Sequence, residues 1–540
     1  MTQRQPLPLC CHVLGPGCKW SSKPKFATEL TKFGISDKTD GVQRLARELS
    51  TARDALQLDS AQSHSFFQSA DDISSYTEKL VQYLALVKGF MEAADRRQSG
   101  DHRLLSSMVP INDTIDGNGL RQPLVEKNGD HNEAAASDYS GCLNFCRWQD
   151  ALTGRTIYTQ SARHEYAHVL LAAGILMMTD ARDKVDAIFF ERLTELDETQ
   201  LKLAHQLLLH ASGVLEACLE SMGITPRHIG AKFTDLGVHN EAPTEAQRLT
   251  PTVVPDDDMM AKWREEQLQA PESTKEIERG HSIKRAMEDV AMLKCVPDLA
   301  DGRFPQLLAW IALVEAQELV ILRGVTRKVV DFSLMAKLST DISTRYKECQ
   351  TLAFSLLPNS ISTIAERIRL FCAYKGPYYQ AISMYFQGAA CMLIEDARNC
   401  VQAVANFHKA LVLFEGVVPI ERGYEAKMKA DKVEKKRVSQ LAAVFLRLQQ
   451  IISRDLEIVT HRNDTVYYEP IPQSQVACNG VSLVKAVAFP SVSTSDLWRD
   501  DEITSCLKPT TVAASMEDSD NQQQRNSRAR DGCCASCIVS

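Results

Sequence analysis

Helical periodicity is the feature of this 540-residue sequence that most limits its fold. Apolar residues recur at three and four positions through most of the chain, whereas alternation at every second position is rare and short. Two stretches with this spacing contain Leu80, Tyr83, Leu84 and Val87, and Leu201, Ala204, Leu208 and Ala211. Each set falls on one face of a helix. The pattern predicts an all-α protein with little strand.

Composition limits the location and the partners of the chain. The formal net charge of -8 and the pI near 6.0 provide no basic field for nucleic acid, so we expect none to bind. The 16 cysteines lack the spacing of a disulfide framework, and the first residues lack the pattern of a secretory signal. The longest apolar runs, 166–178 and 307–322, are too short or too interrupted to span a bilayer. We therefore expect a cytoplasmic protein with reduced thiols.

Three polar stretches interrupt the helical pattern. Those near 109–141 and 224–282 are rich in Pro, Gly, Asp and Asn, which is typical of surface insertions. The third stretch covers 498–540 and favours a flexible tail. The expected organisation is therefore one helical domain over 1–497, with two insertions, followed by the tail.

A helical hairpin is predicted over 377–416. Small and large apolar residues alternate along its two helices, so that the helices can pack closely, as in tetratricopeptide hairpins. No clean repeat of that module's period is visible, which favours an irregular helical solenoid.

Four separated motifs resemble those of the Bro domain family. "NFCRWQDAL" at 144–152 is similar to the family's Phe-x-Trp-x-Asp strand, with Trp148 and Asp150 in place and Cys146 where Phe is expected. "VEAQE" at 314–318, "MAKLST" at 335–340 and "NDTVYYEPIP" at 463–472 follow in the family's order. Each motif is short, but the ordered set combined with a terminal prenylation box resembles the family member that ends on a CAAX motif.

The resemblance implies a curved, tetratricopeptide-like helical body with a small sheet patch. It also implies a monomeric adaptor without enzymatic activity or a cofactor, acting with the ESCRT-III membrane-remodelling machinery. The expected partner is the C-terminal amphipathic helix of a charged multivesicular body protein. The expected locations are endosomal membranes and the nuclear envelope.

The C-terminal sequence Cys537-Ile538-Val539-Ser540 fits the C-a-a-X rule, and a terminal Ser favours a farnesyl group on Cys537. One lipid chain gives marginal membrane binding, so a second signal is expected. Cys533 and Cys534 are candidate palmitoylation sites. A redox pair of Cys534 with Cys537 and a chance ending are the alternatives. We predict a protein that is anchored peripherally to a membrane.

The sequence "HEYAH" at 164–168 is a literal H-E-x-x-H motif. On a helix, His164 and His168 would lie one turn apart, with Glu165 as the general base of a zinc hydrolase. No recognisable third-ligand motif follows, and the same stretch resembles a core helix of the Bro domain. We therefore expect no metal, with the zinc hydrolase as the alternative function and a generic helical scaffold as another.

A partner helix would need exposed apolar residues on the receiving surface. The resemblance places the family's binding patch on Val320, Leu334 and Leu338. Leu334 and Leu338 are four residues apart and so share a helix face. The alternative is that they belong to the core, in which case Leu338→Asp would unfold the domain instead of abolishing partner binding.

Overall fold

A computed structural model gives the fold of this chain. The structure describes residues 13–14, 19, 21–22, 25–32, 39–58, 66–98, 146–159, 162–190, 197–229, 298–299, 302–356, 363–428, 432–473, 476–500 and 503. The predicted insertion at 109–141, most of the one at 224–282 and nearly all of the tail lie outside these residues.

Helices dominate the described residues, as the sequence predicts. The helices are α1 (Phe26–Lys32), α2 (Asp40–Ala55), α3 (Ala70–Gln98), α4 (Ala162–Phe190), α5 (Glu198–Ser221), α8 (Arg303–Val325), α9 (Phe332–Phe354), α10 (Thr363–Met392), α11 (Ala397–Met428) and α12 (Lys432–Arg462). Short π and 3-10 segments follow at η3 (Asn463–Tyr467) and η4 (Asp496–Arg499). Asp197 and Asp331 cap α5 and α9 through their carboxylates.

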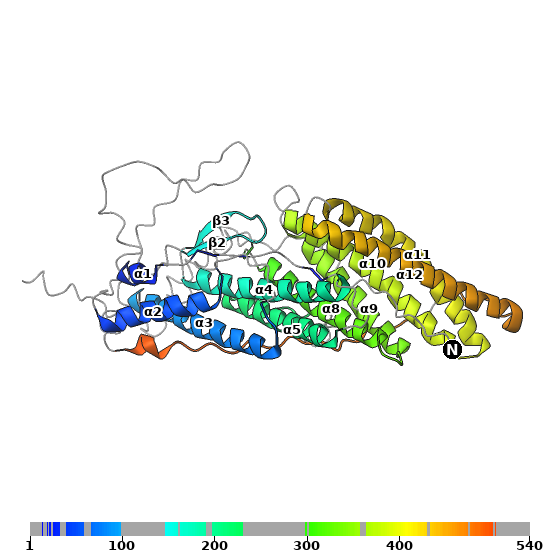
Figure 1. Cartoon of the computed structure of the whole chain (residues 1–540), viewed down its shortest axis with the longest axis horizontal. Coiled ribbons are helices and arrows are strands. Elements are labelled where there is room, and N and C mark those ends of the chain that lie inside the picture. The colour runs from blue at the N-terminus through cyan, green and yellow to red at the C-terminus, as the bar shows by residue number, and fades with distance from the viewer. Residues whose placement is uncertain are drawn as a thin grey trace, which may run out of the picture.

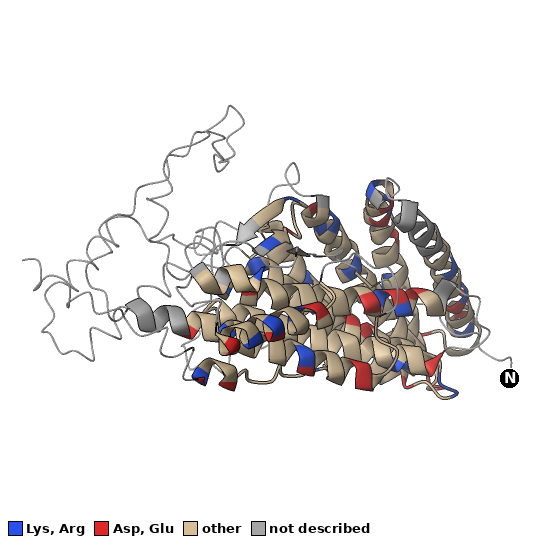
Figure 2. Ribbon diagram, turned by 60° about the vertical axis from the view of Figure 1, so that its left-hand side comes forward, with Lys and Arg blue, Asp and Glu red and all other residues tan. Residues whose placement is uncertain are grey.

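The helices pack in chain order along an elongated molecule (Figure 1). α4 packs on α5, α5 on α8, α8 on α9 and α9 on α10. α10, α11 and α12 form the far end of this series. Lys, Arg, Asp and Glu are interspersed over the helices seen in Figure 2. The mainly helical architecture expected from the sequence is therefore confirmed.

The small sheet predicted from the Trp148 motif is also present. β1 (Ser21–Ser22), β2 (Cys146–Gln149) and β3 (Thr156–Thr159) form an antiparallel sheet in the order β1-β2-β3. Trp148 lies opposite Ser21 on one side and Ile157 on the other. This register directs the buried Trp148 indole toward the helices.

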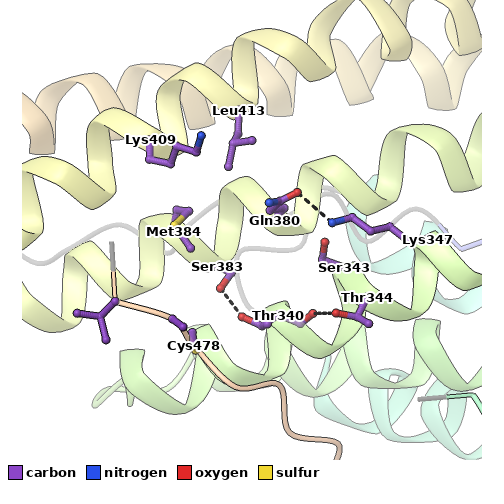
Figure 3. A pocket seen from close by; sticks show the side chains of 12 residues that line it. Thr340, Ser343, Thr344, Lys347, Gln380, Ser383, Met384, Lys409, Leu413 and Cys478 are labelled. Carbon is purple, nitrogen blue, oxygen red and sulfur yellow. Dashed lines mark hydrogen bonds between the residues drawn. The ribbon is translucent and has the colours of Figure 1, made fainter. Parts of the chain in front are cut away.

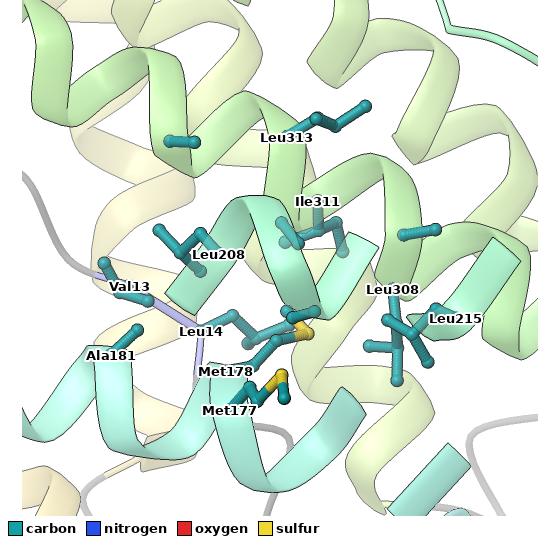
Figure 4. Close-up of a cluster of buried hydrophobic side chains, with 14 of the residues drawn as sticks. Val13, Leu14, Met177, Met178, Ala181, Leu208, Leu215, Leu308, Ile311 and Leu313 are labelled. Atoms are coloured by element: carbon teal, nitrogen blue, oxygen red, sulfur yellow. The ribbon is translucent and has the colours of Figure 1, made fainter. Parts of the chain in front are cut away.

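A segment near the N-terminus completes the core between α4, α5 and α8 (Figure 4). Val13 and Leu14 are both buried among side chains that include Met178, Leu208 and Ile311. Burial of each such side chain contributes about 1.5–3 kcal/mol. Val13 and Leu14 are therefore part of the packed core.

The predicted hairpin corresponds to α10 and α11, which are joined by a tight turn at 393–396. A Cβ added at Gly388 would lie 2.7 Å from the Phe407 ring, so small and large residues face each other across the pair. α11 is also long and apolar enough to cross a bilayer by length and composition, although 44% of the relevant window is buried. Because it packs between α10 and α12, its apolar face is accounted for by the bundle.

After α12 the chain turns back on itself. The Asn463 amide group donates to the Glu469 carbonyl (2.9 Å) and accepts from the Glu469 amide (3.2 Å), which fixes the reversal. Residues 476–500, called the strap here, then run along α9, α5 and α3. Backbone amides of Val481 and Val487 donate to the carbonyls of Lys337 and Leu209.

The packed domain continues beyond residue 497, where the sequence analysis places its end. Trp498 is buried, its Nε1 donates to the Leu86 carbonyl (2.9 Å), and its ring packs against Phe90. Ile503 is buried as well. The expected start of a flexible tail at 498 is therefore too early, because the Trp498 indole anchors this stretch to α3.

Candidate functional site

The VEAQE motif lies in the middle of α8, where three polar residues are fully buried. Glu315 accepts from the Leu14 amide (2.5 Å), which holds the N-terminal segment. Gln317 donates to the Val481 carbonyl (3.2 Å) and accepts from the Leu483 amide (3.1 Å), which holds the strap. Glu318 pairs with Lys375 (2.5 Å) and accepts from the Tyr346 hydroxyl. The motif thus connects three distant segments to one helix.

Burial raises the pKa of Glu315 well above its ordinary value of 4.5, and the nearby Glu318 adds to the rise, while the Leu14 hydrogen bond, Lys375 and Arg182 oppose it. The folded state therefore retains a proton that the unfolded state loses above about pH 4.5, so this group makes stability fall as pH rises toward its folded pKa. Burial likewise raises the pKa of Asp298, to about 6, and that of Glu318.

We expect Glu315→Gln to flatten the fall in the free energy of unfolding as the pH rises above about 4.5. Glu315 can bind at most one more proton in the folded state than in the unfolded state. Its removal therefore changes the slope of the free energy of unfolding against pH by at most about 1.4 kcal/mol per pH unit. Urea unfolding at several pH values measures it, with Glu220→Gln on the exposed face of α5 as the control. If the free energy of unfolding of Glu315→Gln fell with pH as steeply as that of the unchanged chain, the raised pKa of Glu315 would be contradicted.

The Trp148–Asp150 motif fixes the sheet to the helices. The Asp150 carboxylate accepts from the Thr153 amide (2.6 Å) and from the Asp298 amide (2.9 Å), so it closes the β2–β3 turn and captures a segment 148 residues later. Asp298 in turn pairs with Lys19 and accepts from the Ala151 amide. These carboxylates are buried and occupied by structural partners.

The HEYAH motif belongs to the same buried network. Glu165 is fully buried, forms an ion pair with Arg53 (2.8 Å), and accepts from Trp148 Nε1 (2.6 Å) and the Tyr83 hydroxyl (2.9 Å). Burial lowers the pKa of His168 well below its ordinary value, with Lys19, His164 and Arg53 acting in the same direction. The neutral His168 ring stacks on Trp148 at 5.3 Å between centroids.

This geometry does not fit a hydrolytic zinc site. A general base must reach a metal-bound water, whereas both oxygens of Glu165 are held by protein groups. Within the described residues, no group of three or more His, Cys, Asp or Glu side chains is arranged to hold a metal ion. The motif instead connects α4 to the sheet and to α2 and α3.

The predicted partner patch is only partly at the surface. Val320 and Leu334 are half-buried, and both lie near the turn that joins α8 to α9. Leu338 is 0% exposed, and its carbonyl accepts from the Gln317 amide group that also holds the strap. The placement of Leu338 on a binding surface is therefore wrong for this conformation. Its helical spacing reflects core packing, which is the alternative that the sequence left open.

Val329 is an exposed apolar residue that the motifs did not indicate. It lies in the α8–α9 turn, is 84% exposed, and follows the exposed Arg327 and Lys328. In the sequence, only the Val329-Val330 pair within a polar turn indicates an exposed apolar site, and this indication is weak without a structure. Val320, Val329 and Leu334 together are called the α8–α9 surface below.

The lipidation residues Cys533, Cys534 and Cys537 lie outside the described residues. Their assignment stays a prediction from the C-terminal sequence.

Comparisons with known proteins agree with this architecture. The family model described as "BRO1-like domain" matches residues 289–525, from just before α8 to beyond the strap. A solved structure described as "Structure basis for endosomal targeting by the Bro1 domain" is similar at a TM-score of 0.50 and 13% sequence identity, covering 92% of this chain and 98% of that chain. The search of curated proteins gives no match.

The fold is thus that of a helical Bro1 domain. The family model covers less than half of this chain, in the region that contains three of the four motifs, whereas the structural match shows the fold alone.

Proposed function

We propose that the chain is a non-enzymatic adaptor that binds the amphipathic C-terminal helix of an ESCRT-III subunit and is held at a membrane by a farnesyl group on Cys537. The BRO1-like match over 289–525 is the observation that carries the adaptor role. It includes the whole α8–α9 surface. The related structure concerns endosomal targeting, which supports endosomal membranes as a location. The nuclear envelope remains a proposal from the resemblance alone.

The α8–α9 surface offers apolar contacts of the kind that an amphipathic helix requires. Val320 and Leu334 come from adjacent helices, and Val329 projects from the turn between them. Arg327 and Lys328 add positive charge beside these residues. A helix with one apolar face and acidic flanking residues therefore suits this surface.

Tethering would strengthen a weak contact of this type. A lipid at Cys537 confines the domain near the bilayer, which raises its effective concentration toward filament subunits assembled there. The C-terminal CAAX sequence supports this part of the proposal, because it is the kind of sequence that receives a prenyl group. Cys533 and Cys534 would supply the second membrane signal.

We expect Leu334→Asp to weaken binding of the subunit helix at least tenfold with little loss of stability, because Leu334 is half-buried at the start of α9. Leu338→Asp should instead unfold the domain, since it places a carboxylate in the core. Fluorescence anisotropy with the subunit peptide and thermal unfolding separate the two effects. Wild-type affinity in Leu334→Asp would exclude the α8–α9 surface.

Imaging in cells tests the membrane part separately. The intact chain should be found on membranes, Cys537→Ser should be diffuse, and Leu334→Asp should stay on membranes without the subunit. A membrane-bound Cys537→Ser chain would refute the farnesyl anchor while leaving the adaptor role standing.

A further inference from the structure

A cleft of about 270 Å³ lies between α9, α10, α11 and the first residues of the strap (Figure 3). For comparison, a cavity of about 150 Å³ in a protein core accommodates benzene. The lining residues that matter here are Lys347, Gln380, Met384, Lys409, Leu413 and Val476. This space, called the α9–α11 cleft, is separate from the α8–α9 surface, because it is lined by residues from Thr340 onward on α9.

The charged groups of the cleft are two ammonium groups. Figure 3 shows Lys347 and Lys409 on α9 and α11, on opposite sides of the cleft. None of the twelve lining residues is acidic, and neither lysine forms an ion pair with another described residue. Lys347 makes a 3.3 Å hydrogen bond to the Gln380 side-chain oxygen, which leaves its charge uncompensated.

The hydroxyl groups of the cleft do not compete as donors to an anion. Ser343 donates to the Gly376 carbonyl (2.9 Å), and Thr344 donates to the Thr340 carbonyl (3.0 Å). Thr340 and Ser383 bond to each other at 2.6 Å and also reach the Ala336 carbonyl. The side-chain donors that remain for a ligand are therefore the two lysine ammonium groups and the Gln380 side-chain amide.

The remaining lining of the cleft consists of apolar side chains and of the first residues of the strap. Met384 and Leu413 are half-buried, and Val476 is 66% exposed at the edge of the cleft. Residues 476–478 belong to neither a helix nor a strand, and within the described part of the chain their backbone groups make no backbone hydrogen bond. Backbone N–H and C=O groups without a backbone partner can pair with an extended peptide, while neighbouring pockets receive its side chains.

We propose that the α9–α11 cleft binds an acidic peptide segment of a protein partner in extended conformation. A carboxylate of the peptide lies between Lys347 and Lys409, and an adjacent aliphatic side chain packs on Met384 and Leu413. Two ammonium groups without a carboxylate partner favour the anion, and the apolar wall favours a peptide over a free anion. The site operates independently of the partner helix on the α8–α9 surface.

Binding of a labelled probe peptide, Ac-Val-Glu-Val-Glu-Leu-NH2, to the full chain tests the proposal by fluorescence anisotropy. We expect saturable binding that weakens with salt, and a loss of about tenfold in affinity for Lys409→Met and for Lys347→Met. Lys337→Met is the matched control, because Lys337 is an exposed lysine on α9 outside the cleft. It should bind like the unchanged chain.

Two further measurements locate the contact and identify its source. The probe with Gln in place of both Glu residues should bind at least tenfold more weakly, and free glutamate should not compete at matched concentration. Methyl NMR of Met384 should shift on binding of the acidic probe. Equal binding of the Gln probe, equal losses in Lys337→Met, or competition by free glutamate would each overturn the proposal.

Discussion

We expect Glu165→Ala to lower the free energy of unfolding by about 3–5 kcal/mol, because it leaves Arg53 buried without its carboxylate. The change also removes the acceptor of the Trp148 indole and of the Tyr83 hydroxyl. Each buried donor that loses its partner adds a desolvation cost. Since domains are stable by about 5–15 kcal/mol in total, the variant should be marginally folded. Equilibrium denaturant unfolding measures the change.

Glu198→Ala is the matched control for this experiment. Glu198 is also a helical glutamate that pairs with basic groups, but its side chain is 56% exposed and its partners lie 3.6 Å away. The control should lose less than about 1 kcal/mol. Added zinc should restore neither variant. Unchanged stability in Glu165→Ala would mean that the buried ion pair does not hold the sheet to the helices.

The sequence predicted the helices because their apolar spacing directly reflects burial. Leu80, Tyr83, Leu84 and Val87 are all 0% exposed, as their common helix face requires. The strand at Trp148 was also predictable, since its motif is preserved around the buried indole and Asp150. These features depend on local patterns, which a single sequence contains.

The sequence could not separate core from surface on α9. Leu334 and Leu338 have the same spacing, yet one is half-buried and the other fully buried. The difference arises because α8 and the strap meet near Leu338, and the strap lies more than 130 positions later in the chain. Likewise, HEYAH has the spacing of a metal motif, whereas its environment is set by Arg53 and Trp148.

The strap gives the second large expected effect, at Gly213 in α5. A Cβ added there would lie 1.8 Å from the Val487 carbonyl oxygen, so even alanine must displace the strap backbone. We expect Gly213→Ala to lower the free energy of unfolding by about 2–3 kcal/mol, despite the higher helix propensity of alanine. Amide exchange at Val487, which donates to Leu209, should accelerate. Hydrogen exchange and denaturant unfolding measure the two effects.

The same substitution at Gly416 in α11 is the matched control, because no atom lies within 4 Å of a Cβ built there. Gly416→Ala should raise the free energy of unfolding by about 0.5–1 kcal/mol, since alanine loses less backbone entropy in a helix. Opposite signs for the two variants would establish that close approach of the strap, and not helix propensity, requires glycine at 213. If both variants were stabilised, the strap would not pack on α5 in solution.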